Sequence, residues 1–224
     1  MPGRIYLITG GDSAGHPFGE TAPLTENILR DGGFEVTREE NLNRVKQPGG
    51  LADFDAVVLH GRFPDRDDQA ERSFESFVHG GKGLTVVHIA SNSFECSARW
   101  RKLVGRVWEY GGPPPFTSSH PEPPGPFQVN IVDTAHPITT GLQDFDLIQD
   151  ERYQDLLVAP NARAHDLATA TLEGRTEPVA WVLTPPQGGR VFHITLGHNH
   201  TTYENKGFQM LLNHGVAWTA GVPI

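Results

Sequence analysis

The apolar positions in the first half of the chain alternate between short strand-like runs and helical stripes. Two stretches with apolar residues at helical spacing predict helices around 24–29 and 65–79, the second beginning at acidic residues and ending at Gly80. Short, strongly apolar runs indicate buried strands at 4–9, 34–38, 56–59 and 84–88. This alternation predicts an α/β fold of the flavodoxin-like kind, a three-layer α/β/α sandwich around a mostly parallel sheet.

The second half of the chain is richer in strand-like runs. A run at 127–132 is followed by runs at 178–183 and 190–196, and the Pro- and Gly-rich turn between the last two indicates a hairpin. A final helix carries five residues on one face: Phe208, Leu211, Leu212, Val216 and Thr219. Because no internal repeat or linker divides this pattern, we expect one domain over 1–224.

The composition changes sharply over residues 111–126, which read GGPPPFTSSHPEPPGP. Pro has no backbone N–H, so this segment forms neither a regular helix nor a central strand. Loops of this length are usually functional or disordered. We therefore expect a long loop or lid here, with His120 placed to contact a bound ligand.

The charge balance is acidic, with 27 Asp and Glu against 18 Lys and Arg and a formal charge of −9. An acidic surface argues against nucleic acid as a partner, because phosphates are neutralised by clustered Lys and Arg. The first apolar run is too short for a signal peptide, and no run approaches the roughly 20 residues of a spanning helix, so we expect a cytoplasmic protein with no membrane partner. The single cysteine, Cys96, cannot form an internal disulfide, and we expect an ordinary thiol.

Polar clusters follow four of the strand-like runs. In open α/β sheets ligands bind outside the carboxyl ends of the strands, so this recurrence indicates a site. The stretch GGKGLTVVH at 80–88 is the most informative, because it places an imidazole where a buried strand ends. A structural role remains an alternative for each residue, and for His60 and His200 most of all. The clusters contain Asp12, His16, His60, Arg62, His88, Ser91, Asn92, His198, Asn199 and His200.

The imidazoles of these clusters are candidate ligands of a divalent metal, with zinc as the first candidate ion. The candidates are His16, His88, His198 and His200, although their spacing is not diagnostic of a metal site. The segment Asp150-Glu151-Arg152 offers two carboxylates, or alternatively a solvated acidic stretch paired locally with Arg152. The chain lacks the HExxH, P-loop and GxGxxG motifs, so we expect no nicotinamide cofactor.

Taken in order, several segments resemble the trehalose-utilisation (ThuA-like) family, a branch of the class I glutamine amidotransferase-like folds. The resemblance covers nearly the whole chain, and it is the order and spacing of the segments that make it specific. Besides the first loop, which ends at His16-Pro17, they are GKGLTVVHIAS around His88, AHPITTGLQDF at 135–145, DERY at 150–153, PVAWV at 178–182, GRVFHITLGH at 189–198 and the terminal NHGVAWTAG.

The resemblance implies that His88 stands where the glutamine amidotransferases have their nucleophilic Cys. Their catalytic His corresponds to His198, but the Pro-Glu that usually follows it is replaced by Asn199-His200. Without a thiolate at this turn, glutamine hydrolysis through an acyl-enzyme is not available. Cys96 lies eight residues too late to replace it.

The resemblance also implies a role in the catabolism of disaccharides such as trehalose or sucrose through 3-keto derivatives. The carbonyl of a 3-keto sugar acidifies the C2–H, and a base that works near neutral pH suits its abstraction. On this hypothesis His88 or Glu151 is the base, and His198 stabilises the oxyanion or leaving group. Elimination would cleave the glycosidic bond, whereas reprotonation would isomerise the sugar. The expected sugar contacts are Asp12, His16, His60, Arg62, Ser91, Asn92, His120 and Asn199.

The alternative from a different class is a non-catalytic sugar-binding or regulatory protein that kept the amidotransferase-like cleft without its nucleophile. An amidase or peptidase would lack a convincing nucleophile. In the two leading interpretations the partner is a small-molecule sugar, and a divalent ion could stabilise the enolate in the enzymatic one. Homodimers are common among such enzymes, so a homodimer is a further hypothesis.

Overall fold

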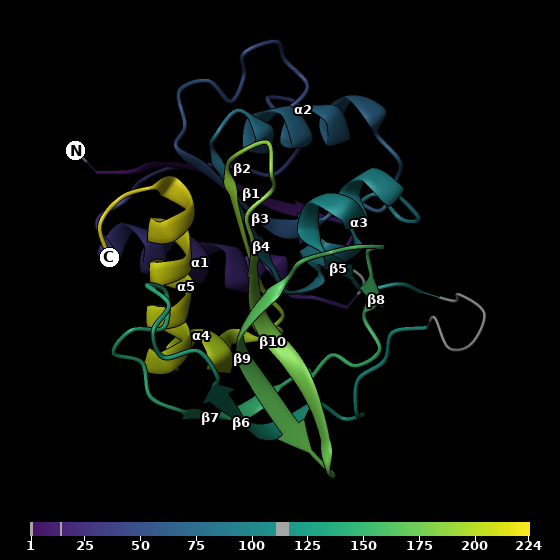
Figure 1. The fold of residues 1–224 in the computed structure, drawn as a ribbon, viewed down its shortest axis with the longest axis vertical. Helices are drawn as coiled ribbons and strands as arrows, with labels where there is room; N and C mark the ends of the chain where they lie inside the picture. Colours follow the sequence, from purple (N-terminus) through teal and green to yellow (C-terminus); the bar gives the residue numbers. More distant parts are fainter. Residues whose placement is uncertain (1, 14, 111–116) are drawn as a thin grey trace.

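The main element of the structure, a computed structural model that describes residues 2–13, 15–110 and 117–224, is a nine-stranded sheet (Figure 1). In spatial order the strands are β2 (Glu35–Glu39), β1 (Arg4–Gly11), β3 (Ala56–Arg62), β4 (Gly83–Val87), β11 (Arg190–Ile194), β10 (Arg175–Leu183), β9 (His165–Leu172), β6 (Gly125–Ile131) and β7 (Phe145–Asp150). The short strands β5 (Arg106–Val107) and β8 (Leu157–Val158) pair separately.

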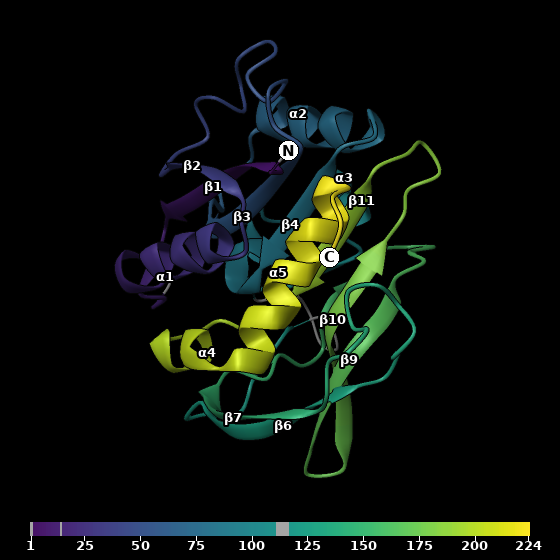
Figure 2. The ribbon, with the colours of Figure 1, turned by 90° about the vertical axis from the view of Figure 1, so that its left-hand side faces the viewer.

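Helices lie against both faces of this sheet (Figures 1 and 2). They are α1 (Phe18–Asp31), α2 (Asp68–His79), α3 (Ala98–Val104), α4 (His200–Glu204), α5 (Lys206–Ala220) and the 3-10 helix η1 (His88–Asn92). Both faces of the sheet are covered because successive side chains of a strand point to opposite faces, as strand β1 illustrates. Ile5 and Leu7 join a core cluster with α1 and α5, whereas Tyr6 and Ile8 join one with α2 and α3. Among the described residues, no helix is long and apolar enough to cross a bilayer.

The sheet is parallel over one half only, so the expectation of a mostly parallel sheet was wrong. The pairings from β2 across to β11 are parallel, and those from β11 across to β7 are antiparallel. The chain returns directly between β9 and β10 and between β10 and β11, and such short connections can join only antiparallel strands. The predicted 178–183 and 190–196 hairpin is confirmed, as are the helical and strand segments of the first half.

One glycine allows α5 to pack closely on the sheet. A Cβ at Gly83, the first residue of β4, would lie 2.1 Å from the backbone oxygen of Thr219. We expect Gly83→Ala to lower the free energy of unfolding by about 2 kcal/mol, because the helix must move away from the strand. Urea unfolding followed by circular dichroism measures this loss.

Gly19 provides the matched control for that substitution. It is an exposed residue in the first turn of α1, and no heavy atom lies within 4 Å of its hypothetical Cβ. Alanine has the higher helix propensity, so Gly19→Ala is expected to raise stability by about 0.5–1 kcal/mol. Equal losses in the two variants would contradict the close-packing argument.

Candidate metal centre

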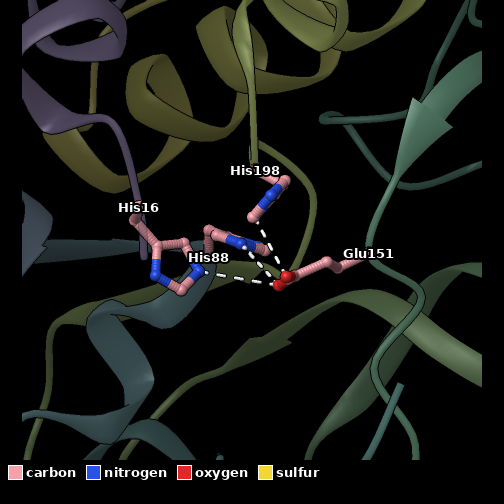
Figure 3. A group of neighbouring side chains, drawn as sticks. All are labelled: His16, His88, Glu151 and His198. Atoms are coloured by element: carbon pink, nitrogen blue, oxygen red, sulfur yellow. Dashed lines mark ion pairs between the residues drawn. The ribbon is translucent and has the colours of Figure 1, made fainter. Parts of the chain in front are cut away.

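Four side chains from distant parts of the sequence converge beyond the ends of the sheet strands (Figure 3). His16 lies between β1 and α1, His88 directly follows β4, and His198 lies between β11 and α4. Glu151 directly follows β7, the strand at the antiparallel edge. One nitrogen from each imidazole and one oxygen from the carboxylate all lie within 4.8 Å of one another. We call these four residues the His3Glu cluster.

The carboxylate of Glu151 lies at the centre of the cluster. Its Oε2 is 3.2 Å from His88 Nε2 and 3.5 Å from His16 Nε2, and its Oε1 is 3.1 Å from His198 Nδ1. The side chains of His16, His88 and Glu151 are each less than a tenth exposed, and that of His198 is 19% exposed. The cluster is therefore nearly shielded from water, with His198 at its more open side.

The backbone conformation at His88 aims its ring into the cluster. The predicted strand 84–88 ends one residue early, at Val87, because His88 adopts φ +54° and begins η1. This left-handed conformation is unfavourable for a residue with a Cβ, and such strain is found mainly at functional sites. His88 Nδ1 lies 2.5 Å from the carbonyl oxygen of Thr195, the residue that follows β11, and this contact fixes the ring there.

The hydrogen bonds of two rings fix which nitrogen carries the proton when the ring is neutral. His88 Nδ1 and His16 Nδ1 each contact a backbone carbonyl, of Thr195 at 2.5 Å and of Ser13 at 2.9 Å. A carbonyl only accepts, so both Nδ1 atoms carry the proton and each Nε2 of a neutral ring presents a lone pair to Glu151. A backbone carbonyl that orients imidazole in this way is the usual outer partner of a metal-binding His.

Electrostatics favour a cation at the centre of this cluster. Burial opposes ionisation of Glu151, but the neighbouring imidazoles of His16, His198 and His88 outweigh it and hold the pKa of the carboxyl well below its usual range. Burial lowers the pKa of His16, so this ring is neutral near pH 7. For His198 burial acts in the same direction, but contact with Glu151 outweighs it and raises the pKa. An anionic carboxylate faced by imidazole lone pairs is repulsive unless a proton or metal ion lies between them.

The donor set fits a divalent transition metal. Among the described residues, His16 Nε2 and His198 Nδ1 are buried without a hydrogen-bond partner, although the oxygens of Glu151 lie near both. Imidazole nitrogens with one carboxylate oxygen are ligands that zinc and neighbouring transition metals accept. His16, His88, Glu151 and His198 would hold the ion. Of the predicted ligands, His200 does not join them, because it is exposed at the first residue of α4.

A cavity of about 290 Å³ adjoins the His3Glu cluster on one side. This volume is near the lower end of the range of about 300–1,000 Å³ found for small-molecule sites. His120 Nε2 lies 3.5 Å from Glu151 Oε1, and His120 Nδ1 lies 3.3 Å from a carboxylate oxygen of Glu122. The described lining residues are Gly15, His16, Ile89, Trp108, Tyr110, His120, Glu122, Pro124, Glu151, Tyr153 and His198.

The aromatic wall of this cavity was not among the predicted site residues. Tyr153 is fully buried, its ring lies 4.7 Å from that of His88, and its hydroxyl oxygen lies 3.1 Å from His88 Nε2. Trp108 packs on Tyr153 at 4.4 Å between ring centroids. The sequence signal for Tyr153 was its place in the DERY segment, directly beside the carboxylates. Of the predicted lid, residues 111–116 lie outside the described residues, and the part after them supplies His120 and Glu122 to the cavity.

Several predicted sugar contacts instead bind other parts of the protein. His60 is buried between α1 and α4, with Nδ1 2.9 Å from Thr25 Oγ1 and Nε2 3.0 Å from the Tyr203 hydroxyl. The Asn199 side chain caps α4 by accepting from the backbone N–H of Thr201. Within the described part of the chain, the following predicted residues do not line the cavity: Asp12, His60, Arg62, Ser91, Asn92 and Asn199.

The guanidinium of Arg62 connects the segments behind the cavity. It donates to Asn92 at 2.6 Å, to Glu95 at 2.5 Å and to Asp12. Its carbon lies 5.4 Å from the centre of the Tyr110 ring, which lines the cavity. Ser91 Oγ accepts from the backbone N–H of Trp108. Arg62, Asn92 and Ser91 therefore support the cavity wall from behind.

The alternative of a solvated acidic stretch at 150–152, paired locally with Arg152, was wrong. Asp150, Glu151 and Arg152 are each less than a tenth exposed. Arg152 donates to the backbone oxygen of Arg175 and, among the described residues, makes no ion pair with either carboxylate. Hydrogen bonds from Gly197, His198 and Thr202 to the Asp150 carboxylate hold this stretch against the 197–202 segment.

Comparison with known proteins agrees with this architecture. A ThuA-like protein from Parabacteroides merdae ATCC 43184 is 24% identical with a TM-score of 0.81, covering 100% of this chain and 92% of that one. One from Bacteroides uniformis ATCC 8492 is 16% identical with a TM-score of 0.74, covering 97% of this chain and 91% of that one. A β-galactosidase from Rahnella sp. R3 is 14% identical with a TM-score of 0.66, and this chain matches 32% of it. These identities establish a shared fold alone.

No curated protein matches the chain. The family model described as "Trehalose utilisation", ThuA, matches residues 4–219, which is nearly the entire sequence. That match agrees with the segments on which the resemblance rests, from the first loop to the terminal helix. The chain therefore belongs to the ThuA family.

Proposed function

We propose that this protein is a divalent-metal-dependent enzyme of disaccharide catabolism that removes a proton beside the carbonyl of a 3-keto sugar. The observation that supports the proposal is the His3Glu cluster, which lies at the wall of a cavity of small-molecule size. We place this activity in the cytoplasm, on a three-layer α/β/α sandwich of the glutamine amidotransferase-like kind. A homodimer remains a prediction of the same proposal.

The proposed roles of the four cluster residues are those of metal ligands. A divalent ion bound there would polarise the sugar carbonyl and stabilise the enolate that forms when the neighbouring proton leaves. His88, Glu151 and His198, for which base and donor roles were predicted, then orient the ion instead. Three of the four ligands line the cavity and His88 does not, so the sugar would approach from the side opposite His88.

His120 is the residue that we propose as the general base. It lines the cavity, lies beside the cluster without belonging to it, and has the Glu122 carboxylate next to its other nitrogen. It would accept the C2 proton of the sugar and return it to the oxygen that leaves C1, so that the C1–O bond breaks with no net change in protons. Return of the proton to carbon instead would give isomerisation or simple exchange.

The aromatic wall is suited to a sugar ring. Trp108, Tyr110 and Tyr153 line one cavity with polar His120 and Glu122. Aromatic faces pack against the C–H groups of a sugar, while the polar side chains take its hydroxyls. Glutamine hydrolysis is disfavoured, because the exposed Cys96 thiol donates to Glu109, which raises the pKa of that thiol.

Proton NMR of a 3-keto disaccharide in D2O tests the proposal. The metal-loaded wild-type protein is expected to exchange or eliminate the C2 proton. His120→Gln is expected to slow this reaction by about 100-fold, the contribution typical of a general base, while metal content stays unchanged. His136→Gln is the control, because His136 is outside both the cavity lining and the cluster.

A wild-type protein that binds the keto sugar without exchanging its proton would overturn the enzymatic proposal. The non-catalytic sugar-binding alternative would then account for the cavity. Equal rates for wild type and His120→Gln would leave the reaction in place but remove His120 as its base.

A further inference from the structure

One buried carboxylate outside the His3Glu cluster connects two of its members. Asp150, the last residue of β7, is 1% exposed and accepts four hydrogen bonds. Its Oδ1 accepts from the backbone N–H groups of Glu151 at 2.7 Å and His198 at 3.1 Å. Its Oδ2 accepts from the N–H of Gly197 at 2.9 Å and from the Thr202 hydroxyl at 2.8 Å.

These hydrogen bonds join two segments that are far apart in the sequence. Glu151 follows β7 at the edge of the antiparallel half, whereas His198 follows β11 where the parallel half ends. The turn between β11 and α4 is tightly constrained, since Gly197 has φ +120° and a Cβ there would lie 2.8 Å from the Tyr203 hydroxyl. By accepting from the backbone N–H groups of both Glu151 and His198, Asp150 thus fixes the distance between these two proposed ligands.

All four hydrogen bonds of Asp150 come from neutral donors. Among the described residues it makes no ion pair with Lys, Arg or His, and every partner that it has is a neutral N–H or O–H group. A buried anion without a countercharge is unfavourable. A divalent cation held by the neighbouring Glu151 and His198 would provide that countercharge.

We propose that Asp150 is a positioning residue that sets the metal affinity of the His3Glu cluster. It does so by holding Glu151 and His198 at binding distance before the ion arrives, and by adding a negative charge behind them. This inference rests on the metal-dependent function proposed above. Outer partners of metal ligands commonly contribute about 10–100-fold to affinity.

Asp150→Asn tests this role with little change in size. In one orientation the NH2 group of the amide faces the backbone N–H of Gly197, and in the other it faces those of Glu151 and His198. Because two donors cannot hydrogen-bond to each other, at least one of the backbone hydrogen bonds is lost in either case. We expect the Kd for Zn²⁺, measured by chelator competition, to weaken by about 10–100-fold. We also expect the visible absorption bands of the Co²⁺-loaded protein to shift, because the two ligands no longer have fixed positions.

Thr202→Val is the matched control. It removes the hydroxyl that donates to Asp150 Oδ2 but leaves all three backbone N–H bonds in place. It is expected to lower the stability of the metal-free protein while keeping the Kd within about threefold of wild type and the Co²⁺ spectrum unchanged. Should Asp150→Asn fail to fold, Asp150→Ser replaces it, with the same weakening expected.

The outcomes separate this inference from the proposed function. An Asp150 variant that loses stability but keeps the wild-type Kd and Co²⁺ spectrum would show a purely structural role and overturn the inference. A wild-type protein that binds neither Zn²⁺ nor Co²⁺ would overturn the metal centre itself, and this inference with it. If the metal affinity depends on Asp150 but the protein has no activity on keto sugars, the inference is supported and only the proposed reaction is contradicted.

Discussion

Glu151→Gln is expected to abolish stoichiometric metal binding by the purified protein. The carboxylate lies within 3.5 Å of all three imidazoles of the cluster, and the substitution removes its charge while preserving its shape. A four-ligand zinc site contributes roughly 10–16 kcal/mol, or about 3 kcal/mol per ligand, so the Kd should weaken by more than about 100-fold. Elemental analysis of untagged protein measures the number of metal ions per chain, and chelator competition measures the Kd.

A neighbouring carboxylate offers the control for this experiment. Glu122 lines the same cavity and lies beside His120, but it does not belong to the His3Glu cluster. Glu122→Gln should therefore retain one ion per chain with an unchanged Kd. Stoichiometric metal with wild-type affinity in Glu151→Gln would show that the ion is not bound through the Glu151 carboxylate.

The sequence predicted the parallel half of the fold well because local signals suffice there. The stripe of Ala70, Phe74 and Val78 faces the core as expected, and Asp67 caps its helix by accepting from the N–H groups of Gln69 and Ala70. The antiparallel half was less predictable. Its register depends on pairing between β9 and β6, whose direction no short segment specifies.

The candidate site was predictable only in part, for a similar reason. His16, His88 and His198 follow strands that lie near one another in the parallel half, so their convergence follows from the rule for strand ends. Glu151 enters from β7 at the opposite edge of the sheet, and no local pattern indicates that this strand ends beside the others. Its function as the centre of the cluster is a property of the tertiary fold.

Two buried histidines outside the cluster give the protein a marked sensitivity to acid. Burial, with smaller effects from nearby imidazoles, lowers the pKa of His60 to about 3. Burial, followed by the charges of Arg106 and His88, lowers the pKa of His193 to about 3. The unfolded chain binds protons on both residues near pH 6.5, whereas the folded protein excludes them down to about pH 3. Their neutral forms therefore stabilise the fold fully above pH 6.5, and this stability is lost as the pH falls toward 3.

Between pH 7.5 and pH 5 the metal-free protein is expected to lose about 4 kcal/mol of unfolding free energy through His60 and His193, about 2 kcal/mol from each. His193→Met should remove half of this loss. Neither nitrogen of His193 has a hydrogen-bond partner among the described residues, so stability at pH 7.5 should change by less than about 1 kcal/mol. Urea unfolding with a chelator present, carried out at both pH values, measures the change in unfolding free energy. His200 is exposed, so the control variant His200→Gln should lose as much stability as wild type. If His193→Met lost stability as steeply as wild type, the acid sensitivity would have to come from the cluster itself, where His16 also titrates below its usual range.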